Sequence, residues 1–244
     1  MNRNYLKYIL IGGASIFVWT GCDDYLNRES TSGVNTPDLI WQNPKAITAV
    51  LADMYDSGLK LDEFDDWYGS KKANLANQTS LSDEATASYQ KESAFDKSNS
   101  TYSYGDYVFN DDMVTRYKQI RIVNNFLLNI EKTSVLSEDE KEELGAEARF
   151  IRAMQYFGLV KRYGGVPLQT VPQEYTAGNT EALYQARDTE AATYDFIINE
   201  CKAIYESLPE VRSSDAKYRA NRGTVLALWS RAALYAGTIA KYSK

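Results

Sequence analysis

The stretch from Glu147 to Leu168 constrains the fold of this chain more than any other, because it lies in a predicted helix with apolar residues on two faces. A helix at a protein surface needs only one apolar stripe, which packs against the core. A helix with two stripes is therefore expected to lie between neighbouring elements. The two stripes are Leu144, Ala148, Ile151 and Met154, and Phe150, Ala153, Phe157 and Val160.

Local signals place the ends of this helix at residues 138 and 163. Ser137 and Glu140 form a capping-box pattern, in which the Ser137 side chain accepts the Glu140 backbone N–H and Glu140 bonds back. Cations near the last carbonyl groups, glycines that allow a left-handed turn and a proline that prevents continuation mark the other end. These residues are Lys161, Arg162, Gly164, Gly165 and Pro167. Because the two glycines follow a helix, they are interpreted as a helix stop and not as a phosphate loop.

Four more segments show the helical spacing of apolar residues. They span residues 44–59, 113–131, 189–208 and 222–241. In the second of these, the predicted buried face is Val114, Tyr117, Ile120, Val123 or Asn124, Leu127, Leu128 and Ile130. The sequence therefore predicts an all-α chain.

Polar connections pair the predicted helices into two αα-hairpins, over residues 113–163 and 189–241. Consecutive helical hairpins with alanines at close contacts are typical of tetratricopeptide (TPR)-like solenoids. We expect TPR-like helical hairpins in an irregular superhelix, with a long irregular insertion near the N-terminus. The last helix has no polar closing face, which solenoids need, so we expect further chain to follow it.

Charge and composition exclude several classes of function. The 244 residues carry a net charge of −6 with both signs mixed along the chain, so no basic face for nucleic acid is expected. The chain has no histidine, which removes His-based catalysis and the usual zinc sites, and we expect neither a metal nor a cofactor. Two cysteines are too few for a disulfide framework, and Cys201 lies on the apolar stripe of a predicted helix.

The first residues read as a secretory signal followed by a lipidation site. A basic start precedes a short apolar run from Tyr8 to Trp19, and Gly21 and Cys22 follow. A cysteine directly after a small residue resembles the bacterial lipoprotein signal, so we expect lipid on Cys22 to hold the protein at a membrane. An ordinary signal peptide with an unmodified cysteine is the alternative. The predicted organisation is a signal peptide at 1–21, a lipidated cysteine and tether at 22–43, and a helical domain at 44–244.

Residues 60–110 show no persistent helical or strand period, and a segment of this length without a clear element is usually functional. Aromatic rings stack on the apolar C–H faces of sugars, while amide and acidic side chains bond the sugar hydroxyls. The candidate glycan contacts are Trp67, Tyr68, Tyr102, Tyr104 and Tyr107, with Asn77. The alternative is that these aromatic residues anchor a long loop to the body of the domain.

Two groups of charged residues have a catalytic or ligand-binding alternative. Neighbouring carboxylates in a polar loop are usually solvated, and these lack the spacing of a calcium loop; they are Asp62, Glu63, Asp65 and Asp66. Arg149 and Arg152 have no acidic residue three or four positions away on their own helix. We expect them to pair with other helices or with backbone carbonyl groups, and a clamp for an acidic sugar or phosphate is the weaker alternative.

Several motifs in one order give the chain a family resemblance. They are Cys22-Asp-Asp-Tyr-Leu26, Glu147-Ala-Arg-Phe-Ile-Arg-Ala153 with Tyr156-Phe157, Arg162-Tyr-Gly-Gly-Val-Pro-Leu168, Arg187-Asp188 before Tyr194-Asp-Phe-Ile-Ile198, Leu208-Pro209, and Arg222-Gly223 before Ala232-Ala-Leu-Tyr-Ala236. With these motifs the chain resembles the N-terminal half of the SusD/RagB family of outer-membrane nutrient-binding lipoproteins. The structural signature in this resemblance is Arg149, Arg152, Gly164, Gly165 and Pro167.

The resemblance implies a TPR-based α fold and a place at the outer membrane, facing the cell exterior, with a lipid anchor at Cys22. It implies that the protein captures an oligosaccharide or polysaccharide, passes it to a SusC-like TonB-dependent transporter, and is not an enzyme. The alternative function is a TPR-like adaptor that binds peptides at the outer membrane. Because glycan contacts vary within the family, the resemblance assigns no contact residue.

Overall fold

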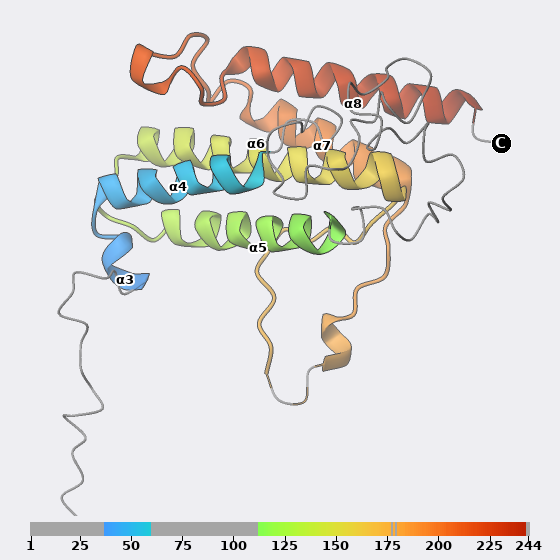
Figure 1. Cartoon of the computed structure of the whole chain (residues 1–244), viewed down its shortest axis with the longest axis horizontal. Coiled ribbons are helices and arrows are strands. Elements are labelled where there is room, and N and C mark those ends of the chain that lie inside the picture. Colours follow the sequence, from blue (N-terminus) through green and yellow to red (C-terminus); the bar gives the residue numbers. More distant parts are fainter. Residues whose placement is uncertain (1–36, 60–111, 177, 179, 243–244) are drawn as a thin grey trace, which may run out of the picture. The chain divides into compact units, whose positions relative to one another are not determined.

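The computed structural model describes residues 37–59, 112–176, 178 and 180–242, and every structural statement below refers to these ranges (Figure 1). The chain divides into two compact units, Met1–Leu39 and Ile40–Lys244. The α-helices are α3 (Pro37–Ile40), α4 (Pro44–Gly58), α5 (Asp112–Ile130), α6 (Glu138–Tyr163), α7 (Glu190–Ile204) and α8 (Arg222–Tyr242), with 3₁₀ turns η3 (Thr180–Leu183) and η4 (Ser214–Ala216). The described ranges contain no strand, and the all-α prediction is confirmed.

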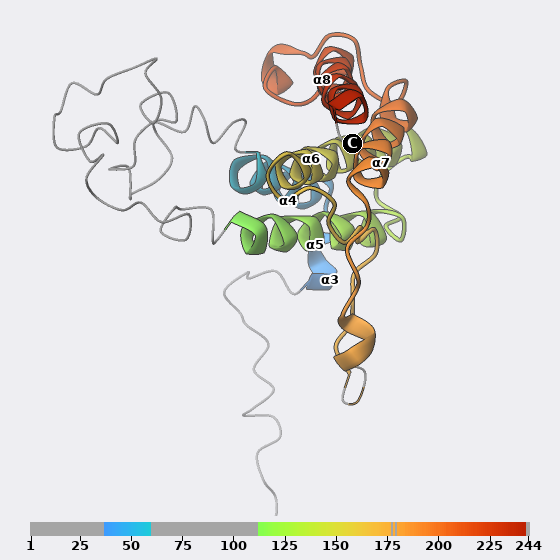
Figure 2. The same cartoon turned by 90° about the vertical axis from the view of Figure 1, so that its right-hand side faces the viewer.

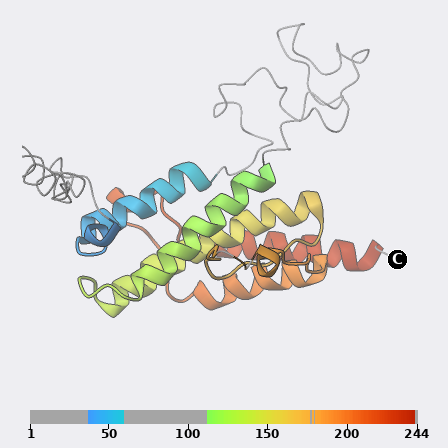
Figure 3. The ribbon, with the colours of Figure 1, turned by 90° about the horizontal axis from the view of Figure 1, so that it is seen from below.

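Helix α6 is the central helix of the second unit. It packs against α4 and α5 on one side and against α7 and α8 on the other (Figures 1 and 3). Helices α5 and α6 form one hairpin and α7 and α8 form another, as predicted. The irregular TPR-like superhelix itself stays a prediction.

The two predicted faces of α6 contact two separate clusters of buried residues. Leu144, Ala148 and Ile151 join the cluster shared with α4 and α5. Phe150, Ala153, Phe157 and Val160 belong to the cluster shared with α7 and α8. Met154 differs from the prediction, because its half-buried side chain packs against this second cluster. The two-sided burial of α6 is otherwise as predicted.

Both ends of α6 follow the local signals in the sequence. The Ser137 hydroxyl accepts the Glu140 N–H at 3.3 Å, and the Glu140 carboxylate accepts the Ser137 N–H at 2.8 Å, which completes the capping box. At the other end Gly164 has φ = 68°, a conformation that glycine adopts without steric cost.

Most of the buried face predicted for α5 is correct, since Ile120, Val123 and Ile130 are fully buried, but two of its predicted residues are exposed. Val114 and Leu128 are exposed, and Phe126 is buried beside Val123 and Ile130. One position along a helix rotates a side chain by about 100°, so Leu128, two positions after Phe126, points about 200° away from it. The error arose because Phe126, Leu127 and Leu128 are consecutive apolar residues, so spacing alone does not say which of them faces the core.

Residues 41–43, at the end of the segment predicted as a tether, pack against the helices of the second unit. The ring of Trp41 packs against that of Phe126 with centroids 5.6 Å apart, and the Trp41 carbonyl accepts a hydrogen bond from Thr133. The Asn43 side chain then caps α4 by accepting the Lys45 N–H at 3.0 Å. The short helix α3 was not predicted from the sequence.

Bilayer crossing requires a long and strongly apolar helix, and none of the helices in the described part of the chain meets that requirement.

Candidate functional site

Most of the site residues predicted from sequence lie outside the described residues. These are Cys22, Trp67, Tyr68, Asn77, Tyr102, Tyr104 and Tyr107. The structure describes the two points where the 60–111 segment joins the body, at the end of α4 and the start of α5.

These two junctions are held together by the side chain of Gln155 on α6. The Gln155 amide donates to the carbonyl of Gly58, the last residue of α4, and accepts from Arg116 on the first turns of α5 at 3.3 Å. The side chain of Tyr117, one position further, donates to the Pro167 carbonyl at 2.8 Å. The end of α4, the start of α5 and the segment after α6 therefore meet at one end of the helical unit.

The segment after α6 is fixed tightly to the start of α7. A Cβ atom on Gly165 would lie 2.0 Å from the Asp188 carbonyl oxygen, so only glycine permits this approach of two backbones. The Asp188 N–H donates to Val166 O at 3.3 Å, and the Asp188 carboxylate accepts the Leu168 N–H at 2.9 Å. The Arg187 guanidinium donates to the carbonyl of Gly165 at 2.7 Å.

Buried side chains of α5 and α6 hold the next residue, Gln169. The Tyr156 hydroxyl accepts the Gln169 N–H at 2.6 Å, and the Asn124 amide donates to the Gln169 carbonyl at 2.9 Å. Burial raises the pKa of Tyr156 to about 12, and its neutral hydroxyl also donates to the Gln169 carbonyl at 3.0 Å. Both backbone polar groups of Gln169, the first residue of the following loop, are therefore bonded to the core.

Arg149 and Arg152 pair with a helix other than their own, as the sequence predicts. Arg149 lies 2.8 Å and Arg152 2.7 Å from the two carboxylate oxygens of Glu200 on α7. Arg152 also donates to Asn124 at 2.8 Å and to the Thr170 carbonyl at 3.2 Å. Burial alone would raise the pKa of Glu200, but the bonds and charges of the two arginines outweigh it and lower that pKa.

A second buried carboxylate, Glu147, joins α6 to the connection between α7 and α8. Glu147 is fully buried and accepts from Arg219 at 2.9 and 2.5 Å and from the Tyr55 hydroxyl at 2.7 Å. Arg212 lies 2.9 Å from the same carboxylate. Burial, followed by the nearby Glu147 charge, raises the pKa of Tyr55. This group binds three parts of the fold together.

No role was predicted for Glu147 or Glu200 from the sequence, although both fall on the buried stripe of their helices. Glu200 is one position before Cys201 and three after Ile197, which are both fully buried. An acid in such a register indicates a buried ion pair. Its arginine partners are far away in the sequence and follow only from the fold.

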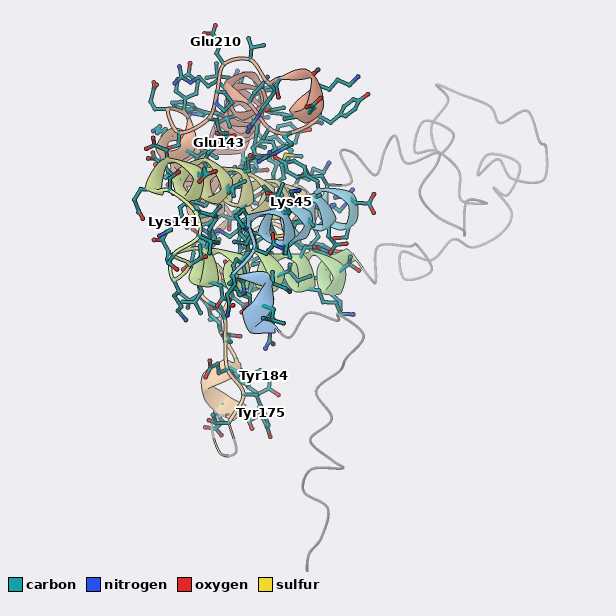
Figure 4. The ribbon with its side chains drawn as sticks, turned by 90° about the vertical axis from the view of Figure 1, so that its left-hand side faces the viewer. Lys45, Lys141, Glu143, Tyr175, Tyr184 and Glu210 are labelled. Carbon is teal, nitrogen blue, oxygen red and sulfur yellow. The ribbon has the colours of Figure 1, made fainter. Side chains whose placement is uncertain are left out.

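Between Gln169 and Gln185 the chain leaves the helices and returns, and we call this segment the arm (Figure 2). It carries η3 and, at residue 178, a glycine with φ = 96°. Tyr175 and Tyr184 lie on the arm, away from the helices, with 71% and 80% of their surfaces exposed (Figure 4). No group of acids and cysteines in the described ranges is placed to hold a metal ion. The arm thus carries two strongly exposed tyrosine side chains.

Comparison with protein families decides what kind of chain this is. Residues 24–234 match the profile of a SusD-like family described as starch-binding and associating with the outer membrane. The chain belongs to the SusD-like family. Members of this family are carbohydrate-binding, non-catalytic proteins.

Solved structures of SusD-like proteins share the fold. A SusD-like protein from Bacteroides fragilis is 28% identical, with a TM-score of 0.63 over 81% of this chain and 36% of its own. A laminarin-binding SusD-like protein is 23% identical, with a TM-score of 0.61 over 80% and 41%. Surface glycan-binding protein A from Bacteroides fluxus is 20% identical, with a TM-score of 0.57 over 82% and 42%.

The chain thus spans less than half the length of these solved SusD-like structures. A comparison with curated proteins gives no significant match.

Proposed function

We propose that this SusD-like protein is a glycan-binding lipoprotein of the outer cell surface, which captures oligosaccharide and passes it to a SusC-like TonB-dependent transporter. The match of residues 24–234 to the outer-membrane starch-binding family carries the proposal. On α6, Glu147, Arg149 and Arg152 take part in ion pairs that hold the fold together, so none of these three residues is assigned to the ligand. A TPR-like adaptor function gains no support from any feature of the described residues.

The glycan contacts are assigned to the aromatic residues of the 60–111 segment. This assignment rests on their chemistry, since tyrosine and tryptophan rings stack on the C–H faces of sugars. It gains support from the bonds of Gln155 and Tyr117, which fix the ends of that segment beside the root of the arm. The residues proposed are Trp67, Tyr68, Tyr102, Tyr104 and Tyr107, with Asn77.

Affinity electrophoresis of the purified protein in gels with and without polysaccharide tests glycan binding. The panel comprises laminarin, amylopectin, galactomannan and polygalacturonate. We expect retardation by at least one polysaccharide and about tenfold weaker binding of the Trp67→Ala/Tyr68→Ala variant, from the loss of two stacking contacts. A matched control is Tyr218→Ala, which removes an aromatic ring exposed on the connection between α7 and α8. A wild-type protein that none of these polysaccharides retards contradicts the proposal.

The anchor and the transporter are tested in cells. A Cys22→Ser variant should leave the membrane fraction, because the acyl chains proposed at Cys22 supply the membrane affinity. Wild-type protein extracted in mild detergent should co-purify with a large TonB-dependent outer-membrane protein. Equal membrane association of Cys22→Ser and wild type would remove the anchor from the proposal, and repeated absence of such a partner would remove the transporter.

A further inference from the structure

The two ends of the arm are fixed by hydrogen bonds, whereas the part between them is strongly exposed. These ends are held side by side. The Gln185 amide donates to the Leu168 carbonyl at 3.2 Å, and just outside the arm the Asp188 carboxylate accepts the Leu168 N–H. Arg152 and Asn124 hold the first residues of the arm through backbone carbonyl groups. Between these ends, Val171, Tyr175 and Tyr184 are all exposed. Figure 4 shows the two tyrosines on the part of the arm that projects from the helices.

This exposure does not follow from packing needs. Single exposed aromatic residues are ordinary on protein surfaces, but these apolar side chains share one short segment that projects from the helices (Figure 2). A connection between helices of a hairpin domain needs only a few residues. Buried donors and acceptors that fix a longer connection reduce the conformational entropy lost when the connection binds something.

The absence of basic residues from the arm indicates which kind of ligand it suits. The sequence has no lysine or arginine between Arg162 and Arg187, although the chain has 27 of them. The arm instead carries amide, hydroxyl and carboxylate side chains beside its tyrosines; in the described residues these include Gln173, Thr180 and Glu181. An anionic lipid surface or an acidic polysaccharide would be held by cations, which the arm lacks. Tyrosine rings with neighbouring amides and carboxylates suit the C–H faces and hydroxyls of a neutral sugar.

We propose that the arm is a carbohydrate-contacting element, in which Tyr175 and Tyr184 stack on a neutral polysaccharide. This inference rests on the proposed glycan-binding function and adds a second contact region to it. The tyrosines lie on a rooted segment and lose few rotamers on binding, since each ring has two side-chain torsions. The arm therefore favours neutral over acidic glycans.

The test compares tyrosine variants of the arm in affinity electrophoresis with laminarin, amylopectin and galactomannan as neutral probes and polygalacturonate as the acidic probe. We expect Tyr175→Ala/Tyr184→Ala to bind the retarding neutral polysaccharide about tenfold more weakly, from two lost stacking contacts. Tyr175→Phe/Tyr184→Phe keeps the rings and should stay within about threefold of wild type. Tyr218→Ala, which removes a ring that is 87% exposed outside the arm, should bind like wild type.

The outcomes separate this inference from the function on which it rests. If wild type binds no polysaccharide, the proposed function fails and the arm inference fails with it. If wild type and Tyr175→Ala/Tyr184→Ala bind a neutral polysaccharide equally, glycan binding stands and the arm inference is overturned. The arm inference is also overturned if the double variant keeps its glycan affinity but loses co-purification with an outer-membrane protein, because the arm is then a protein contact. Unchanged thermal melting of the variants, expected for exposed side chains, shows that the fold is intact.

Discussion

Replacement of Glu200 by glutamine tests whether the ion pairs between α6 and α7 hold the fold. The carboxylate is buried and lies 2.7 Å from Arg152 and 2.8 Å from Arg149. Removing one partner of a buried ion pair costs about 3–5 kcal/mol, because the remaining charge is left without compensation. The half-buried Arg149 can turn to water, and glutamine keeps one acceptor oxygen. We therefore expect Glu200→Gln to lower the free energy of unfolding by about 2–4 kcal/mol at pH 7.

Urea denaturation followed by circular dichroism measures this loss, with an unchanged dependence on urea concentration as the sign of an unchanged fold. Glu206→Gln is the matched control, since Glu206 lies on the connection after α7 and is 78% exposed in its pair with Arg222. An exposed pair contributes about 1 kcal/mol or less. Equal stability of the two variants would refute the assigned role of Glu200.

The pH dependence gives a second and independent check. The two arginines hold the pKa of Glu200 below its usual value, so its stabilisation is complete above an unfolded pKa of about 4.3. That stabilisation is lost as the pH falls through the lower pKa of the folded state. The gap between wild type and Glu200→Gln should therefore be full at pH 7 and should narrow below about pH 4. A gap that stays constant through the acid range would refute the electrostatic explanation.

Two further predictions concern close packing. Gly165→Ala should destabilise the protein by about 1–3 kcal/mol in thermal melts, because the added Cβ would clash with the backbone of Asp188. The control Gly237→Ala, whose Cβ would have no atom within 4 Å, should be neutral or slightly stabilising. Cys201 is buried, and burial raises the pKa of its thiol to about 12. In a Cys22→Ser variant, Ellman's reagent at pH 8 should therefore react with Cys201 only after unfolding. Fast reaction of the folded protein would contradict the burial.

The sequence predicted those features of the fold that depend on neighbouring residues. The capping box at Ser137, the stop at Gly164 and the two apolar faces of α6 all follow from spacing within one helix. In α5 the predicted Ile120, Val123 and Ile130 are buried, but Phe126 was missed and Leu128 was wrongly included. Local rules identify a helix and most of its buried stripe. Single positions at the edge of the stripe depend on the rest of the fold, and so does the last turn of α7, which ends at Ile204 and not at the predicted residue 208.

The features that sequence reasoning missed depend on distant partners. The closeness of Gly165 to Asp188 exists only because the start of α7 returns to the end of α6. Glu147 meets Arg212 and Arg219 across more than sixty positions of sequence. A charged residue in a buried register indicates that a partner exists, but one sequence does not say which arginine supplies it.

The same distant contacts connect the scaffold to the candidate site. Arg152 bonds at once to Glu200 of α7, to Asn124 of α5 and to the Thr170 carbonyl at the start of the arm. An arginine held at three points by a planar guanidinium cannot move without disturbing all three. Loss of Glu200 therefore removes the anion that fixes Arg152 and loosens the root of the arm as well as the core. The residues of α6 act as scaffold for the interior, and through Arg152 they also determine how firmly the exposed tyrosines are presented.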